Sequence, residues 1–413
     1  MQKLGEIASV KGGKRLPKGE FLTIDPNSHP YIRTKDIENH VIKIDQLEYV
    51  PDAVQKKIAR YIVDAGDLVV SIVGTVGSCA IVPAELHRAN LTENCAKILL
   101  NTEDYTTDFL YYFLRSPQGQ QEIFKNTVGS TQLKLPLYGI ENIDLPTLTV
   151  TNQKAIAHIL GTLDDKIELN QKMNQTLEKI AKAIFKSWFV DFDPVRAKAE
   201  CRPTGLPPEI SDLFPDELVD SDIGEIPKGW EVKTIQDVAK VTSGKRPPEK
   251  ENVQSERCPY VVYGGAGPMA FCSEPLNFTK PAIITGRVGT LGKVFYLTDD
   301  CWVSDNSILI CDAGVYSSLV FYILQSIDMT AFNVGSTQPL VTGRDIKNLN
   351  LVTPSDSLLH EYKELFDLIK NRQSTANAEI EALSELRDTL LPKLISGELR
   401  IPDANKFLEE AGI

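Results

Sequence analysis

The chain repeats itself, and this repeat constrains the fold more than any other feature of the 413 residues. Short blocks recur in one order along the two halves, which is the signature of a duplicated structural unit. The paired blocks are 4–20 and 235–251, 73–77 and 288–292, 108–116 and 318–326, 128–132 and 334–338, and 140–145 and 346–351. The sequence therefore predicts two copies of one fold.

Each copy has the same expected secondary structure. Short apolar stretches punctuated by Gly and Pro predict strands, and one apolar helix is expected in the third block of each copy. The two copies occupy residues 1–150 and 230–356. Each is a plausible size for a single domain of mixed α/β structure.

A long helix is expected after each globule, over 151–192 and within 357–413. Apolar residues recur there with alternating spacings of three and four, which is a heptad seam. We expect the two helices to pack on each other as an antiparallel coiled coil; the alternative is that each packs on its own globule. The seam residues are Leu160, Leu163, Ile167, Asn170, Asn174, Leu177, Ile184, Phe366, Ile369, Ile380, Leu383 and Leu390. Asn170 and Asn174 either fix the register or face solvent.

The connector at 193–229 is rich in proline and acidic residues. Proline stiffness predicts a semi-extended path from the first helix to the second globule. The chain would then have approximate two-fold symmetry. Residues 199–229 of this connector hold eight acidic and two basic residues, a net charge of −6, which is half of the chain's −12. The first globule, with 16 Lys/Arg and 18 Asp/Glu, is close to neutral. Tight binding of nucleic acid is therefore expected to need a basic partner.

Polar loops that recur in both copies are the candidate contacts to DNA. Gly-Lys-Arg at 13–15 and 244–246 is either a phosphate clamp or a solvated turn. The Gly-Thr-x-Gly turns and Gly-Ser-Thr-Gln loops can approach or read DNA, or can shape the local chain. Arg287 stands where the first copy has Ile72, as expected of a base-reading residue. The predicted contacts are Lys14, Arg15, Arg33, Lys35, Thr75, Ser130, Thr131, Gln132, Lys134, Lys245, Arg246, Arg287, Thr290, Ser336, Thr337 and Gln338.

Signals of catalysis are lacking in the sequence. It has no Asn/Asp-Pro-Pro-Tyr motif, no complete P-loop and no Gly-x-Ser-x-Gly, and its five histidines show neither triad nor metal spacing. The seven cysteines are irregularly spaced, which favours reduced thiols. No apolar run is long enough to predict a membrane span. A cytoplasmic protein without its own catalytic or metal site is expected.

These features resemble the specificity (S) subunit of type I restriction-modification systems, over essentially the whole chain. The most specific stretches are LEKIAKAIFKSWFVDFDPVRAK at 177–198, GEIPKGW at 224–230 and LPKLISGEL at 391–399. Asn152-Gln153 stands where the family often has Glu-Gln. The resemblance implies that each globule is a target recognition domain and each helix a conserved spacer.

The resemblance also implies a set of partners. These are double-stranded DNA with a bipartite site, two methyltransferase (modification) subunits, and motor-nuclease (restriction) subunits. No cofactor is expected in this chain, because S-adenosylmethionine, ATP and magnesium would belong to the partner subunits that methylate adenine and cut DNA. The alternatives are a stand-alone DNA methyltransferase or nuclease, and an interaction scaffold that does not read DNA.

Overall fold

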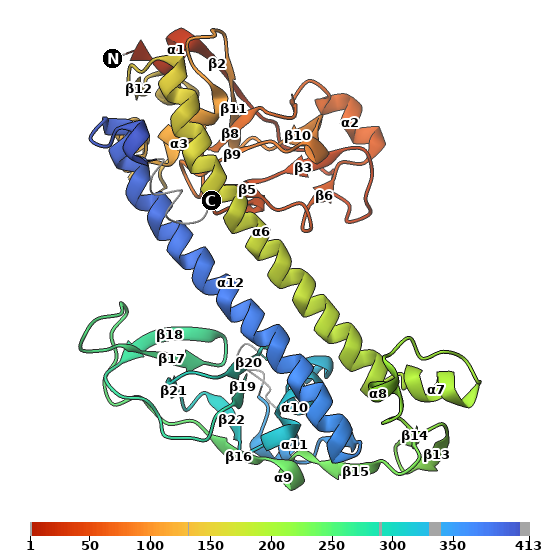
Figure 1. The fold of residues 1–413 in the computed structure, drawn as a ribbon. Helices are drawn as coiled ribbons and strands as arrows, with labels where there is room; N and C mark the ends of the chain where they lie inside the picture. Colours follow the sequence, from red (N-terminus) through yellow and green to blue (C-terminus); the bar gives the residue numbers. More distant parts are fainter. Residues whose placement is uncertain (1, 131, 289–290, 330–339, 405–413) are drawn as a thin grey trace. The chain divides into compact units, whose positions relative to one another are not determined.

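The computed structural model describes residues 2–130, 132–288, 291–329 and 340–404 (Figure 1). The chain forms two compact units. The first contains the chain up to Gln171 together with the chain from Asn377 onward, and the second is Lys172–Ala376. Each unit therefore combines one globule with a part of both long helices. Among the helices described, none has the length and apolarity needed to cross a membrane.

The first globule is built on two four-stranded sheets. The main sheet is antiparallel in the order β2-β11-β8-β9, with β2 (Ala8–Gly12), β11 (Cys95–Leu100), β8 (Leu68–Ser71) and β9 (Cys79–Ile81). The second has the order β6-β3-β10-β7, with β6 (Glu48–Tyr49), β3 (Pro30–Ile32), β10 (Ala89–Leu91) and β7 (Ile62–Val63). In it β3 and β10 run parallel.

The second globule repeats the topology of the main sheet and that of three strands of the smaller sheet. Its main sheet has the order β16-β22-β19-β20, with β16 (Lys240–Ser243), β22 (Ser307–Cys311), β19 (Ala282–Gly286) and β20 (Val294–Leu297). Its smaller sheet has the order β18-β17-β21, with β18 (Gly267–Cys272), β17 (Tyr260–Gly264) and β21 (Trp302–Val303). Strands β17 and β21 run parallel, as β3 and β10 do. The predicted duplication of one mixed α/β fold is confirmed.

Helices and terminal strands also correspond between the globules. In each globule the first strand pairs with the last. These pairs are β1 (Gln2–Lys3) with β12 (Asp144–Leu145), and β15 (Glu231–Thr234) with β23 (Asn350–Thr353). The helices that correspond are α1 (Leu4–Ile7) and α9 (Ile235–Val238), α3 (Thr107–Arg115) and α10 (Ser317–Ser326), and α5 (Leu137–Glu141) and α11 (Gly343–Lys347). Helices α2 (Asp52–Ile58) and α4 (Pro117–Lys125) belong to the first globule.

The apolar helix α3 forms where the sequence predicts it. Thr106 caps its N-terminus by accepting a hydrogen bond from the Phe109 N–H at 3.3 Å, which satisfies one of the free donors of the first turn. Phe109 and Phe113 are fully buried in the core of the first unit. The helix therefore covers the main sheet through its apolar face.

The two long helices are α6 (Val150–Phe189) and α12 (Asp356–Ser396). In the first unit Asp164 pairs with Arg387 at 2.7 Å, and Lys166 pairs with Glu379 at 3.3 Å. The numbering rises along α6 as it falls along α12, so the helices run antiparallel. In the second unit the Gln373 amide donates to the backbone carbonyl of Asn174 at 3.1 Å, and Lys370 pairs with Glu178 at 3.0 Å, so the direction of pairing is the same.

The seam residues lie on the packed side of these helices. Those that are buried are Leu160, Leu163, Ile167, Asn170, Phe366, Ile369, Leu383 and Leu390. Those that are half-buried are Asn174, Leu177, Ile184 and Ile380. The two units use different parts of the seam: Leu160, Leu163 and Leu390 belong to the core of the first, and Phe366 and Ile369 to the core of the second.

The prediction of a semi-extended connector is wrong. The chain from 193 onward forms α7 (Asp193–Ala199), α8 (Pro208–Ser211) and a hairpin of β13 (Leu218–Ser221) and β14 (Gly224–Pro227). Val195 and Phe214 are buried in the core of the second unit, and the Phe214 ring packs edge-on to Trp188 at 5.3 Å. Burial of these apolar side chains stabilises a folded segment that proline content alone does not predict.

Candidate nucleic-acid interface

The recurrent loops emerge at one end of the main sheet in the first unit. Strand β2 ends at Gly12, β11 begins at Cys95, β8 ends at Ser71 and β9 begins at Cys79. The antiparallel register pairs Ser71 with Cys95, which places these four ends together. The Gly-Lys-Arg segment and the Gly-Thr-Val-Gly turn therefore leave the sheet side by side. The second unit has the same register at the corresponding strand ends.

The glycine of each Gly-Lys-Arg block is required by a close backbone contact. A Cβ atom on Gly13 would lie 2.1 Å from the Thr92 carbonyl oxygen, and one on Gly244 would lie 2.2 Å from the Ser304 carbonyl oxygen. No side chain fits at such distances. The glycine has a structural role, and it fixes where the following Lys-Arg pair begins.

The lysine of each block is anchored through its backbone. The Lys14 carbonyl accepts a hydrogen bond from the Tyr31 hydroxyl at 2.8 Å, and the Lys245 carbonyl accepts one from the Trp302 indole N–H at 2.7 Å. The donors come from β3 in one copy and β21 in the other. Two different aromatic residues thus donate to the equivalent backbone carbonyl in the two copies. The lysine side chains themselves are exposed.

The four cations of these blocks are all exposed: Lys14, Arg15, Lys245 and Arg246. The Lys14 ammonium lies 5.9 Å from the centre of the Tyr61 ring, and the Arg15 Nε donates to Glu93 at 2.8 Å. An exposed ion pair of this kind is weak and exchanges readily for a phosphate contact. The structure therefore presents Lys-Arg pairs that an anionic ligand can reach.

A further recurrent block escaped the sequence reading. It is Leu-Thr-Glu-Asn at 91–94 and Val-Ser-Asp-Asn at 303–306, and it forms the turn into β11 or β22. The Asn94 carbonyl accepts from the Ile72 N–H at 2.8 Å, and the Asn306 carbonyl accepts from the Arg287 N–H at 2.9 Å. The signal was present in the sequence, but only asparagine is identical in the two copies. The exposed Asn306 amide and the half-buried Asn94 amide are further candidates for contact with bases.

In each copy the chain that follows the Gly-Ser-Thr-Gln block is hydrogen-bonded to the residue that stands two positions before the first glycine of the Gly-Thr-x-Gly turn. The Ile72 carbonyl accepts from the Leu135 N–H at 2.9 Å, and the Arg287 carbonyl accepts from the Val341 N–H at 3.0 Å. These bonds hold Leu135 and Val341, which follow the two Gly-Ser-Thr-Gln blocks, beside the strand end that leads into the Gly-Thr-x-Gly turn. Thr75, in the first of these turns, is exposed.

The Gly-Ser-Thr-Gln segment of the first unit is a closed loop. Val128 and Lys134 exchange two backbone hydrogen bonds of 2.8 and 2.9 Å. Gly129 has φ of 97°, a conformation that favours glycine. Ser130, Gln132 and the Lys134 side chain are exposed on this loop. Five predicted contacts lie outside the described residues: Thr131, Thr290, Ser336, Thr337 and Gln338.

Arg287 and Arg33 differ in their availability. Arg287 is exposed at the end of β19. The Arg33 guanidinium is only 15% exposed and is held by Asp36 at 2.9 Å and by Glu48 at 2.5 Å. Lys35 lies 3.4 Å from the same Glu48 carboxylate. Arg33 is therefore paired with two carboxylates of the protein, whereas the exposed Arg287 side chain is accessible to a ligand.

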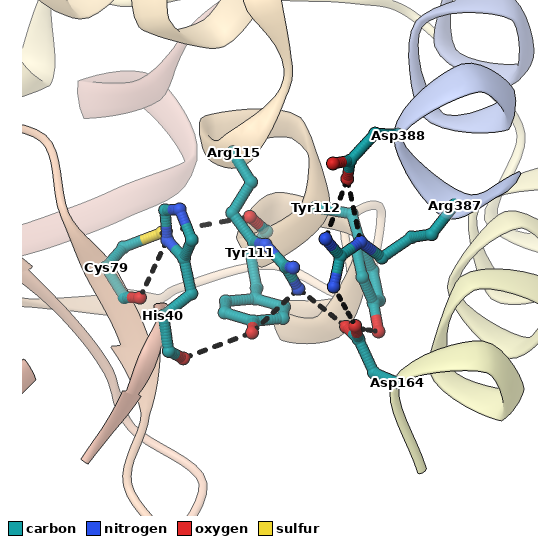
Figure 2. Close-up of polar contacts among 8 residues, drawn as sticks. All are labelled: His40, Cys79, Tyr111, Tyr112, Arg115, Asp164, Arg387 and Asp388. Carbon is teal, nitrogen blue, oxygen red and sulfur yellow. Dashed lines mark hydrogen bonds and ion pairs between the residues drawn. The ribbon is translucent and has the colours of Figure 1, made fainter. Parts of the chain in front are cut away.

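A charged network links the first globule to both long helices (Figure 2). The Asp164 carboxylate of α6 accepts from Arg115 of α3 at 2.6 Å, from Arg387 of α12 at 2.7 Å, and from the Tyr112 hydroxyl at 2.9 Å. Burial raises the pKa of Asp164, but the two guanidinium groups more than offset this and hold it below its usual value. The network fixes the orientation of the globule on the helices.

His40 lies at the far end of this network. The Arg115 guanidinium donates to the Tyr111 hydroxyl at 2.8 Å, and that hydroxyl donates to the His40 carbonyl at 3.2 Å. The imidazole Nδ1 lies 3.2 Å from the Cys79 carbonyl, which only accepts, so Nδ1 carries the proton. Burial, with repulsion from Arg115, lowers the pKa of His40 to about 4.

Comparisons with known proteins cover most of the chain and agree with one another. A family described as the type I restriction modification DNA specificity domain matches residues 1–179 and 227–382. The type I restriction enzyme MjaIX specificity subunit of Methanocaldococcus jannaschii is 27% identical and covers 98% of this chain and 94% of that protein. The HindI specificity subunit of Haemophilus influenzae is 26% identical, over 91% of this chain and 96% of that protein.

The fold has a solved counterpart. The crystal structure of a type I restriction-modification S subunit from M. genitalium aligns with a TM-score of 0.60 and covers 95% of both chains. Its sequence identity is 16%, so this likeness concerns the fold.

Proposed function

The chain belongs to the family of type I restriction modification DNA specificity domains, and on that premise we propose that it reads a bipartite DNA site, one half with each globule. One observation carries the proposal. Among the described residues, both globules place the Gly-Lys-Arg segment and the turn that ends in Asn94 or Asn306 at the same end of the main sheet, held by equivalent backbone hydrogen bonds. Two equivalent surfaces with different side chains suit two half-sites of different sequence.

The roles of the loops follow from their chemistry. Exposed Lys-Arg pairs contact phosphates and position the protein without reading sequence. Arg287 pairs with guanine through two hydrogen bonds, and Gln132 reads adenine in the same manner. Because Arg287 replaces Ile72 between the copies, it discriminates bases in one half-site only.

We infer further that the chain is the non-catalytic part of a larger assembly in the cytoplasm. Methyltransferase subunits and motor-nuclease subunits supply adenine methylation and cleavage, and they bind S-adenosylmethionine, ATP and magnesium. The acidic overall charge supports this division, because a chain of net charge −12 binds DNA weakly unless basic partners contribute phosphate contacts.

Mapping of methylated adenines in cells tests the proposal. Cells with the gene should show one bipartite methylated sequence that is lost on deletion. Replacing residues 1–150 with the first globule of another family member should change one half of that sequence and leave the other intact. A change in both halves would contradict separate reading, and methylation or cleavage by the purified chain alone would favour a stand-alone enzyme.

A further inference from the structure

A cavity of about 370 Å³ opens in the first unit beside the candidate interface. Strand β2 contributes Lys11, β11 contributes Lys97, and the chain that leads into β7 contributes Arg60 and Tyr61. Gly13, whose backbone fits only without a side chain, forms part of the wall. None of the residues that line this cavity is acidic. The cavity therefore gathers positive charge where the Gly-Lys-Arg segment leaves the sheet.

The Tyr61 ring holds two of the cations near the cavity. The Arg60 guanidinium lies 5.4 Å and the Lys14 ammonium 5.9 Å from the ring centre, both within cation–π range. Arg60 also donates to the Tyr61 hydroxyl at 3.4 Å. Lys97 is paired with Asp67 at 3.2 Å, so its charge is balanced within the protein. Lys11, Lys14 and Arg60 supply the excess charge.

The corresponding cavity of the second unit has a different character. It measures about 470 Å³ and lies beside β16, the counterpart of β2. Lys11 faces Lys97 across the strands of the first unit, whereas Thr242 faces Leu309 in the second. Two lysines, Lys240 and Lys245, line the second cavity together with the acidic Asp312. The lining of the first cavity holds three cations and no acidic residue, so its excess of positive charge is the larger of the two.

We propose that the cavity of the first unit binds a phosphate group of a nucleotide, held between Lys11 and Arg60. Convergent cations on a concave, partly apolar surface favour a phosphate over a neutral ligand. The Tyr61 ring already carries cations beside it, so it positions charge and does not serve as a platform for a base. The proposal deepens the proposed function and rests on it: the phosphate belongs to the DNA backbone beside the first half-site, or to a free nucleotide.

Salt dependence of binding tests the site. The intact chain and the double variant Lys11→Gln/Arg60→Gln are titrated with a random-sequence 30-base-pair duplex at several salt concentrations. The loss of one phosphate contact should reduce the slope of log binding constant against log salt by about 1 and weaken binding by roughly five- to tenfold at moderate salt. Both residues are exposed, so the variants should fold, and Arg60→Lys should retain the slope.

The matched control compares single variants: Lys11→Gln removes one charge from the proposed site, and Lys154→Gln removes one charge from another cavity of the same unit, where Asp108 and Asp165 also lie. Lys154→Gln should keep the slope. In a second arm, inorganic phosphate and deoxyadenosine monophosphate are titrated by calorimetry. If the unaltered chain binds phosphate or deoxyadenosine monophosphate and the double variant does not, the site is assigned to a free nucleotide. If only the salt dependence of duplex binding changes, the site is assigned to DNA.

An unchanged slope together with unchanged binding of phosphate would overturn the proposal. A slope loss as large in Lys154→Gln would overturn it as well, because general charge would then explain the effect. Failure of the unaltered chain to bind duplex, with and without methyltransferase subunits, would contradict the proposed function instead, and the phosphate titration would still test the cavity.

Discussion

The Arg387 guanidinium of α12 donates to the Asp164 carboxylate of α6 at 2.7 Å, although 223 residues separate the two in the chain. The same carboxylate accepts from Arg115 of α3 at 2.6 Å. One acidic residue thus contacts two cations from two other helices, and Asp388 also pairs with Arg387 at 2.8 Å. Arg115 is 6% exposed, so removal of the acidic group leaves buried positive charge without compensation.

Asp164→Asn should therefore destabilise the first unit. We expect a loss of about 2–4 kcal/mol in the free energy of unfolding, somewhat below the range for a fully buried pair because Asp164 keeps some solvent contact. The neighbouring Asp165→Asn removes the same charge from an exposed position and should cost less than about 0.5 kcal/mol. Calorimetric unfolding of the full chain compares the two, and equal effects would contradict a structural role for the network.

Gly13→Ala should destabilise the first globule by about 1–3 kcal/mol, because its Cβ would overlap the Thr92 carbonyl and force the backbone apart. Gly12→Ala is the matched control. Its Cβ would meet only the Leu137 side chain at 3.8 Å, an ordinary contact. Hydrogen exchange at the turn into β11 measures the local effect. Equal protection in both variants would show that the close approach is unimportant.

Stability of the first unit should fall as the pH drops from about 6.5 toward 4. The pKa of His40 is about 4 in the folded chain, lowered by burial and by Arg115, against 6.5 for a free histidine. The unfolded chain therefore binds a proton in this window that the folded chain excludes, so stability is complete above the window and is lost on acidification. The loss is on the order of 3 kcal/mol.

The variant His40→Asn can keep the hydrogen bond to the Cys79 carbonyl without titrating. It should flatten the pH dependence between 6.5 and 4, as measured by unfolding midpoints in a pH series. If the unfolding midpoint of His40→Asn falls with pH as steeply as that of the unaltered chain, groups other than His40 cause the acid sensitivity.

Arg287→Gln should relax specificity at a single position of one half-site, with a loss of about 1–3 kcal/mol in discrimination against the wrong base. Lys245→Gln, on a neighbouring loop, should weaken binding of all sequences equally because a phosphate contact carries no sequence information. Methylation mapping and binding to singly substituted duplexes give the readout. If Arg287→Gln weakened the binding of all DNA sequences equally, Arg287 would not be a base-reading residue.

The sequence alone determined the duplicated α/β fold, the two long helices and the recurrent loops. Each of these is encoded locally. A heptad seam is written within a single helix, and a strand or turn depends on neighbouring residues. The repeat then made local signals reliable, because a weak pattern such as Gly-Lys-Arg appeared twice in the same context.

Only the tertiary structure decided which of those residues are available. Arg33 looked like a contact to DNA, yet Glu48 approaches it from another strand and balances its charge. The glycine requirement at Gly13 comes from the Thr92 carbonyl, and Asp164 meets Arg387 only after both long helices have formed. Such contacts join residues far apart in the chain, and their geometry exists only once the core has closed. Local sequence patterns therefore cannot predict these contacts.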